Sequence, residues 1–185
     1  MKIYFTTDYH YDHQNIAGPN LSRWDKGYRD FESVSSMNDA IVNSTNDIVK
    51  ENDILYYLGD WSFGHHSNIL ELRKRLKVKT IHFILGNHDK YITRNSHLFT
   101  SVQDYLEINI HGQDICLFHY PIQEWNKCHR NSWMLCGHSH GMCEYSNSLT
   151  STKKILDVGW DCFRKPLSFQ EIRKIMSTKG IKEHH

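Results

Sequence analysis

The sequence has no long hydrophobic run. None of its apolar stretches approaches the roughly 20 residues that a helix needs to cross a membrane. Met1 is followed at once by the strand-like run 3–7, which leaves no room for the charged and apolar regions of a secretory signal peptide. These two absences predict a soluble protein of the cytoplasm that makes no contact with a membrane.

Paired cysteines and an excess of charge are also lacking. The five cysteines are odd in number and form no C-x-x-C pair, which argues against a disulfide framework. The 22 Lys and Arg residues nearly balance the 21 Asp and Glu residues, so a nucleic-acid partner is neither favoured nor excluded. Histidine is the abundant residue, with 14 copies, and imidazole is the commonest metal ligand.

Repeats, low-complexity tracts and Pro/Gly/Ser-rich linkers are missing from the 185 residues. A chain of this length can bury one sizeable core. We therefore expect a single domain over residues 1–180. Residues 181–185 would then be a short tail, and the final His184-His185 pair is consistent with the remnant of a tag.

The first half of the chain alternates strands with helices. Apolar residues recur at helical spacing over residues 31–49, between the strand-like runs 3–7 and 53–58. A second helix is predicted from Ser67, followed by a strand at 81–85. This order is typical of parallel strands joined by helices.

The second half reads as strands followed by one helix. Residues 105–110 and 115–118 predict a hairpin, and two more strands are expected at 133–136 and 155–158. A capping box formed by Ser168 and Glu171 then predicts a terminal helix. Together the two halves predict a layered α/β/β/α sandwich of mixed sheets.

Metal-ligand residue types follow five of these strand-like runs. Because the carboxyl ends of strands share one edge of a sheet, the clusters are expected to converge on one crevice. They are Asp8-Tyr9-His10, Gly59-Asp60, Gly86-Asn87-His88-Asp89, His119, and Gly137-His138-Ser139-His140.

Carboxylate, imidazole and amide ligands suit Mn, Fe, Co or Zn better than Ca. Asp60 is the natural bridge between two ions, which would then lie roughly 3.5–4 Å apart. The glycines at 59, 86 and 137 are expected to allow close backbone approach beside the ligands.

The ordered motifs D-x-H, G-D, G-N-H-D, a lone His and G-H-x-H resemble those of the calcineurin-like metallophosphoesterase superfamily. The resemblance runs from Lys2 to about Met176. The segments Leu58-Gly59-Asp60-Trp61 and Val158-Gly159-Trp160-Asp161 are similar to the small bacterial and phage members. Several blocks in fixed order carry far more weight than any one of them alone.

The resemblance implies a role for each matching residue. One metal would be held by Asp8, His10, Asp60 and His140, and the other by Asp60, Asn87, His119 and His138. The cofactors would be two divalent ions, manganese first, with iron, zinc, cobalt or nickel as alternatives. His88 would face the phosphate as a catalytic residue while metal-bound hydroxide attacks phosphorus, and Asp89 would orient the His88 ring.

Other residues near the motifs could have either a functional or a purely structural role. His13, Asn15 and His65 are candidate substrate contacts, although surface-loop positions are the alternative. Trp61 could stack on a nucleobase, but packing is favoured. The cysteines and histidines of 128–143 form a weaker zinc-site alternative. The basic run 73–79 is read as the solvated face of a helix or as phosphate contacts.

The leading functional hypothesis is hydrolysis of a phosphodiester of a nucleotide, a cyclic nucleotide or an oligonucleotide. A phosphomonoesterase, a nuclease, or a non-catalytic module that keeps the fold for binding are the alternatives. Such a module tends to lose a metal ligand or the histidine of G-N-H-D, and here every one is present. The sequence leaves the native metal, the natural substrate and the oligomeric state open.

Overall fold

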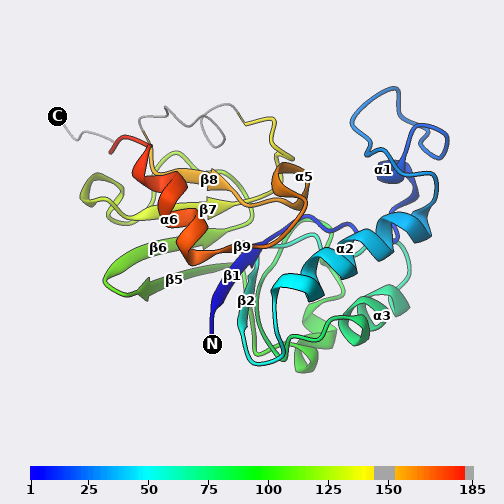
Figure 1. Ribbon diagram of the computed structural model, residues 1–185, viewed down its shortest axis with the longest axis horizontal. Helices are drawn as coiled ribbons and strands as arrows, with labels where there is room; N and C mark the ends of the chain where they lie inside the picture. Colours follow the sequence, from blue (N-terminus) through cyan, green and yellow to red (C-terminus); the bar gives the residue numbers. More distant parts are fainter. Residues whose placement is uncertain (144–152, 182–185) are drawn as a thin grey trace.

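The strands form two mixed sheets (Figure 1). The structure, a computed structural model, describes residues 1–143 and 153–181. The first sheet has the strand order β4-β3-β2-β1-β9, in which β1 to β4 run parallel and β9 runs antiparallel to β1. Its strands are β1 (Ile3–Thr6), β2 (Ile54–Tyr57), β3 (Thr80–Ile84), β4 (Ser101–Gln103) and β9 (Leu167–Ser168).

The second sheet has the order β5-β6-β7-β8. Strands β5 and β6 form an antiparallel hairpin, while β6, β7 and β8 are parallel. Its strands are β5 (Tyr105–Ile110), β6 (Gln113–Phe118), β7 (Trp133–Cys136) and β8 (Ile155–Asp157). Two mixed sheets with associated helices confirm the predicted fold class.

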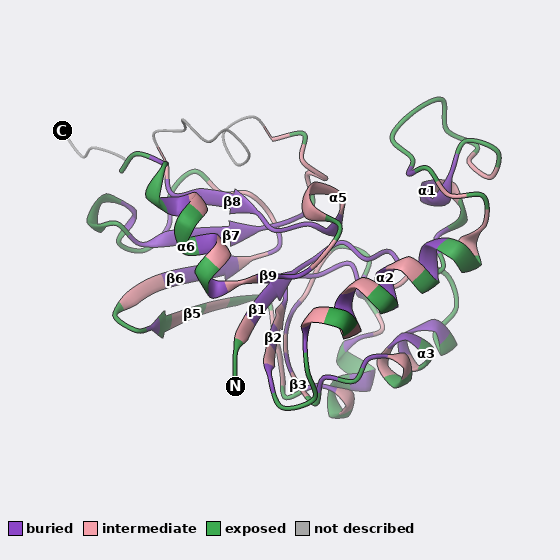
Figure 2. Ribbon diagram, in the orientation of Figure 1, coloured by how far each residue is buried: buried purple, intermediate pink, exposed green. Residues whose placement is uncertain are grey.

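Helices cover the outer face of the first sheet. Met37 of α2 and Leu72 of α3 are fully buried in one apolar cluster with Leu55 and Phe83 of the strands. Figure 2 shows this buried side of α2 and α3 beside exposed positions on the same helices. The helices are α1 (Gln14–Ala17), α2 (Val34–Ile48), α3 (Ser67–Arg75), α5 (Trp160–Phe163) and α6 (Phe169–Ser177), with 3-10 turns at Thr93–Leu98 and Cys128–Arg130.

A second apolar cluster lies between the two sheets. Phe5 of β1 packs there with Leu117 of β6, Leu135 of β7 and Ile172 of α6. Successive strand residues face opposite sides of a sheet, so the neighbours of these residues lie in other clusters. The strand ends are thereby held in two stacked layers whose carboxyl ends lie near each other.

Cys128 and Cys136 pack in a third apolar cluster with Trp125 and Met134. None of the five cysteines, all of which lie within the described residues, forms a disulfide. Burial of these thiols among apolar side chains is the packing that free cysteine usually provides, so this pair contributes to the core. Trp61 is also fully buried in the first cluster, which confirms its predicted packing role.

The predicted elements are found with small shifts. The helix expected over 31–49 spans Val34–Ile48, and the terminal helix begins after the predicted capping box. The short strands β4 and β9 and the short helices α1 and α5 were not predicted. No helix within 1–143 and 153–181 is long and apolar enough to cross a membrane. The predicted tail is mostly outside the described residues.

The capping box of α6 gives a stability prediction. The Ser168 hydroxyl accepts a hydrogen bond from the Glu171 N–H, and the Ser168 N–H donates to the Glu171 carboxylate at 2.8 Å. We expect Ser168→Ala to lower the free energy of unfolding by about 1 kcal/mol in urea titrations. Ser177→Ala is the control, because that hydroxyl bonds the Lys174 carbonyl of its own helix and takes no part in the N-terminal cap. Equal losses in both variants would contradict the capping role.

Candidate metal centre

The metal-type side chains follow the carboxyl ends of strands from both sheets. Asp8 comes after β1 and Asp60 after β2 of the first sheet, while His119 and His138 come after β6 and β7 of the second. The His138 N–H donates to Asp8 Oδ2 at 3.0 Å, which ties the two sheets together at this point. The convergence predicted from the sequence is therefore present.

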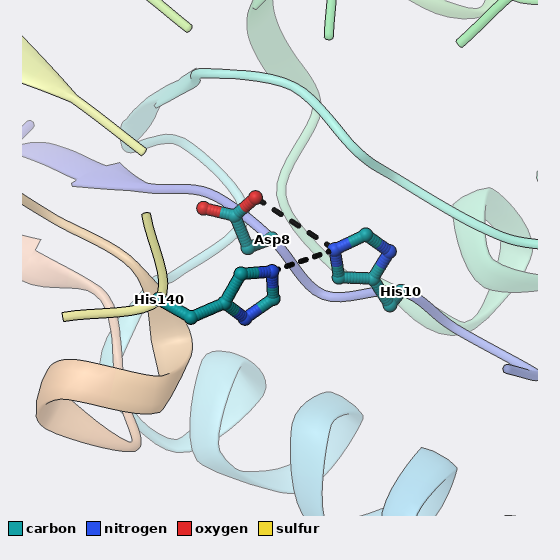
Figure 3. A group of neighbouring side chains, drawn as sticks. All are labelled: Asp8, His10 and His140. Carbon is teal, nitrogen blue, oxygen red and sulfur yellow. Dashed lines mark hydrogen bonds and ion pairs between the residues drawn. The ribbon is translucent and has the colours of Figure 1, made fainter. Parts of the chain in front are cut away.

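One group consists of Asp8, His10 and His140 (Figure 3), whose ligand atoms all lie within 4.8 Å of one another. His10 Nε2 is 3.2 Å from His140 Nε2 and 3.8 Å from Asp8 Oδ1. Atoms that bind one ion at about 2.1 Å are about 3.0–3.4 Å apart at angles of 90–110°. The two imidazole nitrogens have this separation.

The second group consists of Asp60, His119 and His138. Asn87 joins it, because Asn87 Oδ1 lies 3.1 Å from His119 Nε2 and 3.0 Å from His138 Nδ1. His119 Nδ1 donates to the Leu58 carbonyl at 2.8 Å in the tautomer that leaves Nε2 open for a ligand bond. An amide oxygen, a carboxylate and two imidazoles thus face one point.

Asp60 lies between the two groups. Its Oδ2 atom is 3.5 Å from His10 Nε2 of the first group and 3.5 Å from His119 Nε2 of the second. Its Oδ1 atom accepts a hydrogen bond from the His88 N–H at 3.0 Å. One oxygen therefore anchors the neighbouring loop, and the other lies between imidazole nitrogens of the two groups.

The buried atoms of the first group fit a cation. Asp8 Oδ1 has no hydrogen-bond partner although Asp8 is fully buried. Burial raises the pKa of Asp8 well above its usual range and lowers the pKa of His10 well below its own. A buried carboxylate oxygen without a donor is costly, and a bound divalent ion would satisfy it. The mixed donor set suits a first-row divalent metal.

The backbone at these positions is held in the left-handed region. The φ angles are 58° at Asp8, 47° at His10, 58° at Asp60, 65° at His138 and 46° at His140. Non-glycine residues in this region cost about 1 kcal/mol or more each, and they persist where surrounding structure holds them. Five such residues in one place are typical of a functional site.

The three predicted glycines bring backbone against these side chains. A Cβ atom on Gly59, where φ is 104°, would lie 2.6 Å from His119 Nδ1. Cβ atoms on Gly86 and Gly137 would overlap the carboxylates of Asp60 and Asp8. Only a residue without a Cβ fits at these positions, as the sequence predicted.

Asp89 makes contacts other than the predicted one. Its carboxylate accepts hydrogen bonds from the N–H groups of Asp60 at 2.7 Å, Trp61 at 3.0 Å and Gly86 at 2.8 Å. None of these three hydrogen bonds involves the His88 ring. Burial raises the pKa of Asp89 to about 7 against the effect of these bonds. Asp89 therefore shapes the backbone around Asp60.

His88 lies beside both groups, with its ring centroid 5.5 Å from that of His10 and 5.4 Å from that of Phe63. It lines a cavity of about 440 Å³ to which His65 also contributes. His13 is buried, and its ring stacks on Phe63 with centroids 3.7 Å apart. Asn15 accepts a hydrogen bond from the Arg23 N–H at 3.2 Å and does not line this cavity.

Two residues that were not predicted support His140. Asp161 Oδ2 lies 2.6 Å from His140 Nδ1, and Arg29 binds the same carboxylate through Nε at 2.7 Å and Nη2 at 2.9 Å. Arg29 also donates to the Asp8 carbonyl at 2.7 Å. Burial opposes the charge of Asp161, but His140 and Arg29 outweigh it and hold its pKa well below the usual range.

We expect Asp161→Asn to weaken metal binding at the first group by about 10- to 100-fold. A carboxylate that receives the second nitrogen of a ligating imidazole fixes the ring and strengthens the ligand, and the amide cannot replace its charge. The measurement is a Mn²⁺ titration against a fluorescent chelator. Equal weakening of both bound ions, or no change in either, would contradict this local role.

Comparison with known proteins identifies the family to which the chain belongs. A family model of the calcineurin-like phosphoesterase superfamily domain matches residues 1–156. The chain belongs to this superfamily. Membership confirms the resemblance seen in the motifs, and it supports hydrolysis of phosphate esters with divalent metal ions.

Two similar proteins cover nearly the whole chain. An uncharacterized protein of Methanocaldococcus jannaschii is 27% identical over 180 residues, which cover 95% of this chain and 91% of the relative. The crystal structure of a protein of unknown function from Aquifex aeolicus aligns with a TM-score of 0.70 at 25% identity, covering 94% of this chain and 98% of that one. The E. coli phosphoesterase YfcE aligns with a TM-score of 0.42 at 17% identity, over 76% of this chain and 70% of that one.

Proposed function

We propose that this calcineurin-like protein is a dinuclear metal-dependent phosphodiesterase that acts on nucleotide-like substrates. The observation that carries the proposal is the position of Asp60 Oδ2, 3.5 Å from a ligand nitrogen of each group. Two sites that share one carboxylate oxygen match the arrangement of two-metal phosphoesterases. The first site would use Asp8, His10 and His140, and the second Asn87, His119 and His138.

Two divalent ions held at these sites, with manganese favoured, would polarise the phosphate ester and lower the pKa of the attacking water. Side chains of the protein hold the ligand residues of the two sites in place. Asp60 joins the sites, Asp89 holds the backbone on either side of Asp60, and Asp161 orients His140.

His88 is proposed to contact the phosphate. Its ring makes no hydrogen bond to any residue of 1–143 or 153–181, while its N–H donates to Asp60 Oδ1 at 3.0 Å. The ring is therefore available to donate a proton to the departing ester oxygen or to stabilise negative charge on the phosphoryl group.

A diester is favoured over a monoester because space adjoins the site. The cavity beside His88 holds about 440 Å³, within the range of small-molecule pockets, and it offers room for an organic group attached to the phosphate. The basic run 73–79 precedes β3 at the amino end of the sheet, away from the carboxyl-end residues. It is thus less suited to contact a substrate held at the metals.

We also propose that residues 1–180 fold as one unit and that the protein acts in the cytoplasm. Two apolar clusters each combine residues from the two halves of the chain. The first contains Met37 and Trp160, and the second contains Phe5 and Leu135. Cysteines that form no disulfide suit a reducing compartment.

The test compares bis-p-nitrophenyl phosphate with p-nitrophenyl phosphate as substrates of metal-stripped protein reloaded with Mn²⁺. We expect turnover that depends on the metal and prefers the diester. Preference for the monoester would identify a phosphatase. No turnover of either compound by protein that holds two ions would favour a non-catalytic binding module.

A further inference from the structure

The cavity beside His88 has walls from two loops. Ser62, Phe63 and His65 belong to the loop after the segment that carries Asp60, and Lys90 and Tyr91 belong to the loop that follows β3. Asn87 and His88 also line it, so the cavity opens directly onto the second metal group. A group bound in the cavity would therefore lie next to a phosphate bound at the second metal group.

Phe63 gives the cavity an exposed aromatic wall. Its side chain is 38% exposed, although large hydrophobic side chains are usually buried. The Phe63 ring stacks on His13, which is buried, with centroids 3.7 Å apart and planes at 23°. His88 meets it edge-on at 5.4 Å. These contacts hold the ring in place, so it forms a fixed flat surface beside the proposed acid.

The second loop carries another ring and a positive charge. Lys90 Nζ lies 4.9 Å from the centroid of the Tyr91 ring, and both residues line the cavity. The acidic residue in the lining is Asp89, whose carboxylate is buried and accepts three backbone N–H groups. The accessible part of the cavity therefore favours an anionic ligand with a flat apolar face.

We infer that this cavity binds the nucleobase of the substrate, with Phe63 as the stacking surface. The inference rests on the proposed function, since it names the organic group attached to the phosphate. A nucleotide combines the two features that the lining selects, because it has a flat aromatic ring and carries phosphate charge. Ser62 and His65, from the same loop as Phe63, add polar groups to the lining, and the edge of a base needs hydrogen-bond partners.

The experiment compares two probes that differ only by the base. They are the phosphonate analogues of AMP and of ribose 5-phosphate, in which carbon replaces the ester oxygen so that neither can be hydrolysed. Their dissociation constants are measured by calorimetry on the Mn²⁺-loaded protein. Base stacking on an aromatic side chain gives about 5- to 150-fold in affinity, so we expect the AMP analogue to bind at least about 10-fold more tightly.

Variants at position 63 test whether the ring supplies this preference. Phe63→Leu keeps an apolar contact with His13 but removes the ring, and it should reduce the ratio of the two constants to near 1. Phe63→Tyr keeps the ring and should preserve the ratio. Tyr105→Leu is the matched control, since Tyr105 is 39% exposed on β5 and does not line the cavity.

The outcomes separate this inference from the proposed function. Equal binding of the two probes by the native protein, or a ratio that survives Phe63→Leu, would overturn the nucleobase site even if diesters are hydrolysed. A ratio that depends on Phe63 would support the site even in a protein that turns over no ester, because the probes report binding alone.

Discussion

Asp60→Asn is expected to remove one of the two bound ions and to lower diester turnover by roughly 1,000-fold or more. Asparagine can still accept the His88 N–H bond that Asp60 Oδ1 receives, so the neighbouring loop keeps its anchor. The substitution removes the charge and the second carboxylate oxygen. That oxygen is the atom placed between His10 and His119, so both groups lose their shared ligand.

Metal content by mass spectrometry and turnover of bis-p-nitrophenyl phosphate measure this effect. The control is Asp104→Asn, the same chemical change at an exposed position before β5. Circular dichroism establishes that both variants are folded. A folded Asp60→Asn protein that keeps two ions and native turnover would show that Asp60 bridges nothing.

His88→Ala should lower kcat by about 100- to 1,000-fold while two ions remain bound. The bond between this residue and Asp60 is made by its backbone N–H, which alanine retains. The substitution therefore removes only the ring. Since that ring makes no hydrogen bond to a side chain of either metal group, all of which the structure describes, metal affinity should change little.

The comparison for His88 is His97→Ala, which removes an exposed imidazole in the 3-10 turn Thr93–Leu98. We expect native kcat in that variant. The contradictory result would be a His88→Ala protein that loses metal in parallel with turnover, because His88 would then act as a ligand or as scaffold. An ester with a more acidic leaving group should recover part of the lost rate if His88 donates a proton.

The convergence of the metal-type residues could be predicted because it follows from sheet geometry. Asp8, Asp60 and Asn87 follow three neighbouring parallel strands, and the carboxyl ends of such strands share one edge. His119 and His138 follow parallel strands of the second sheet in the same way. The order of these strands could be predicted from the apolar runs and from the helical spacing over residues 31–49 that separates the first two.

Contacts that depend on irregular backbone could not be predicted. Arg29 and Asp161 are 132 positions apart, and Arg29 lies in a segment without periodic structure, so nothing in the sequence pairs them. The adjacency of Asp89 to His88 suggested a contact between their side chains. The hydrogen-bond partners of Asp89 depend instead on a tight turn, in which its carboxylate faces the N–H groups of residues 60 and 61.

The same limit applied to the substrate contacts. His13 and Asn15 are two positions apart, yet His13 is buried against Phe63 and Asn15 bonds the backbone of the following loop. Phe63 itself carried no signal, because an isolated aromatic residue after a motif is more often part of the core. Its exposure became evident only in the structure.

The most direct test of the two-metal account is anomalous X-ray diffraction from crystals of the Mn²⁺-loaded protein, with data on either side of the manganese absorption edge. The account predicts two peaks about 3.5–4 Å apart. One peak should lie among Asp8, His10 and His140, the other among Asn87, His119 and His138, and the Asp60 carboxylate should lie between them. A single fully occupied peak, or two peaks that do not share Asp60, would contradict it.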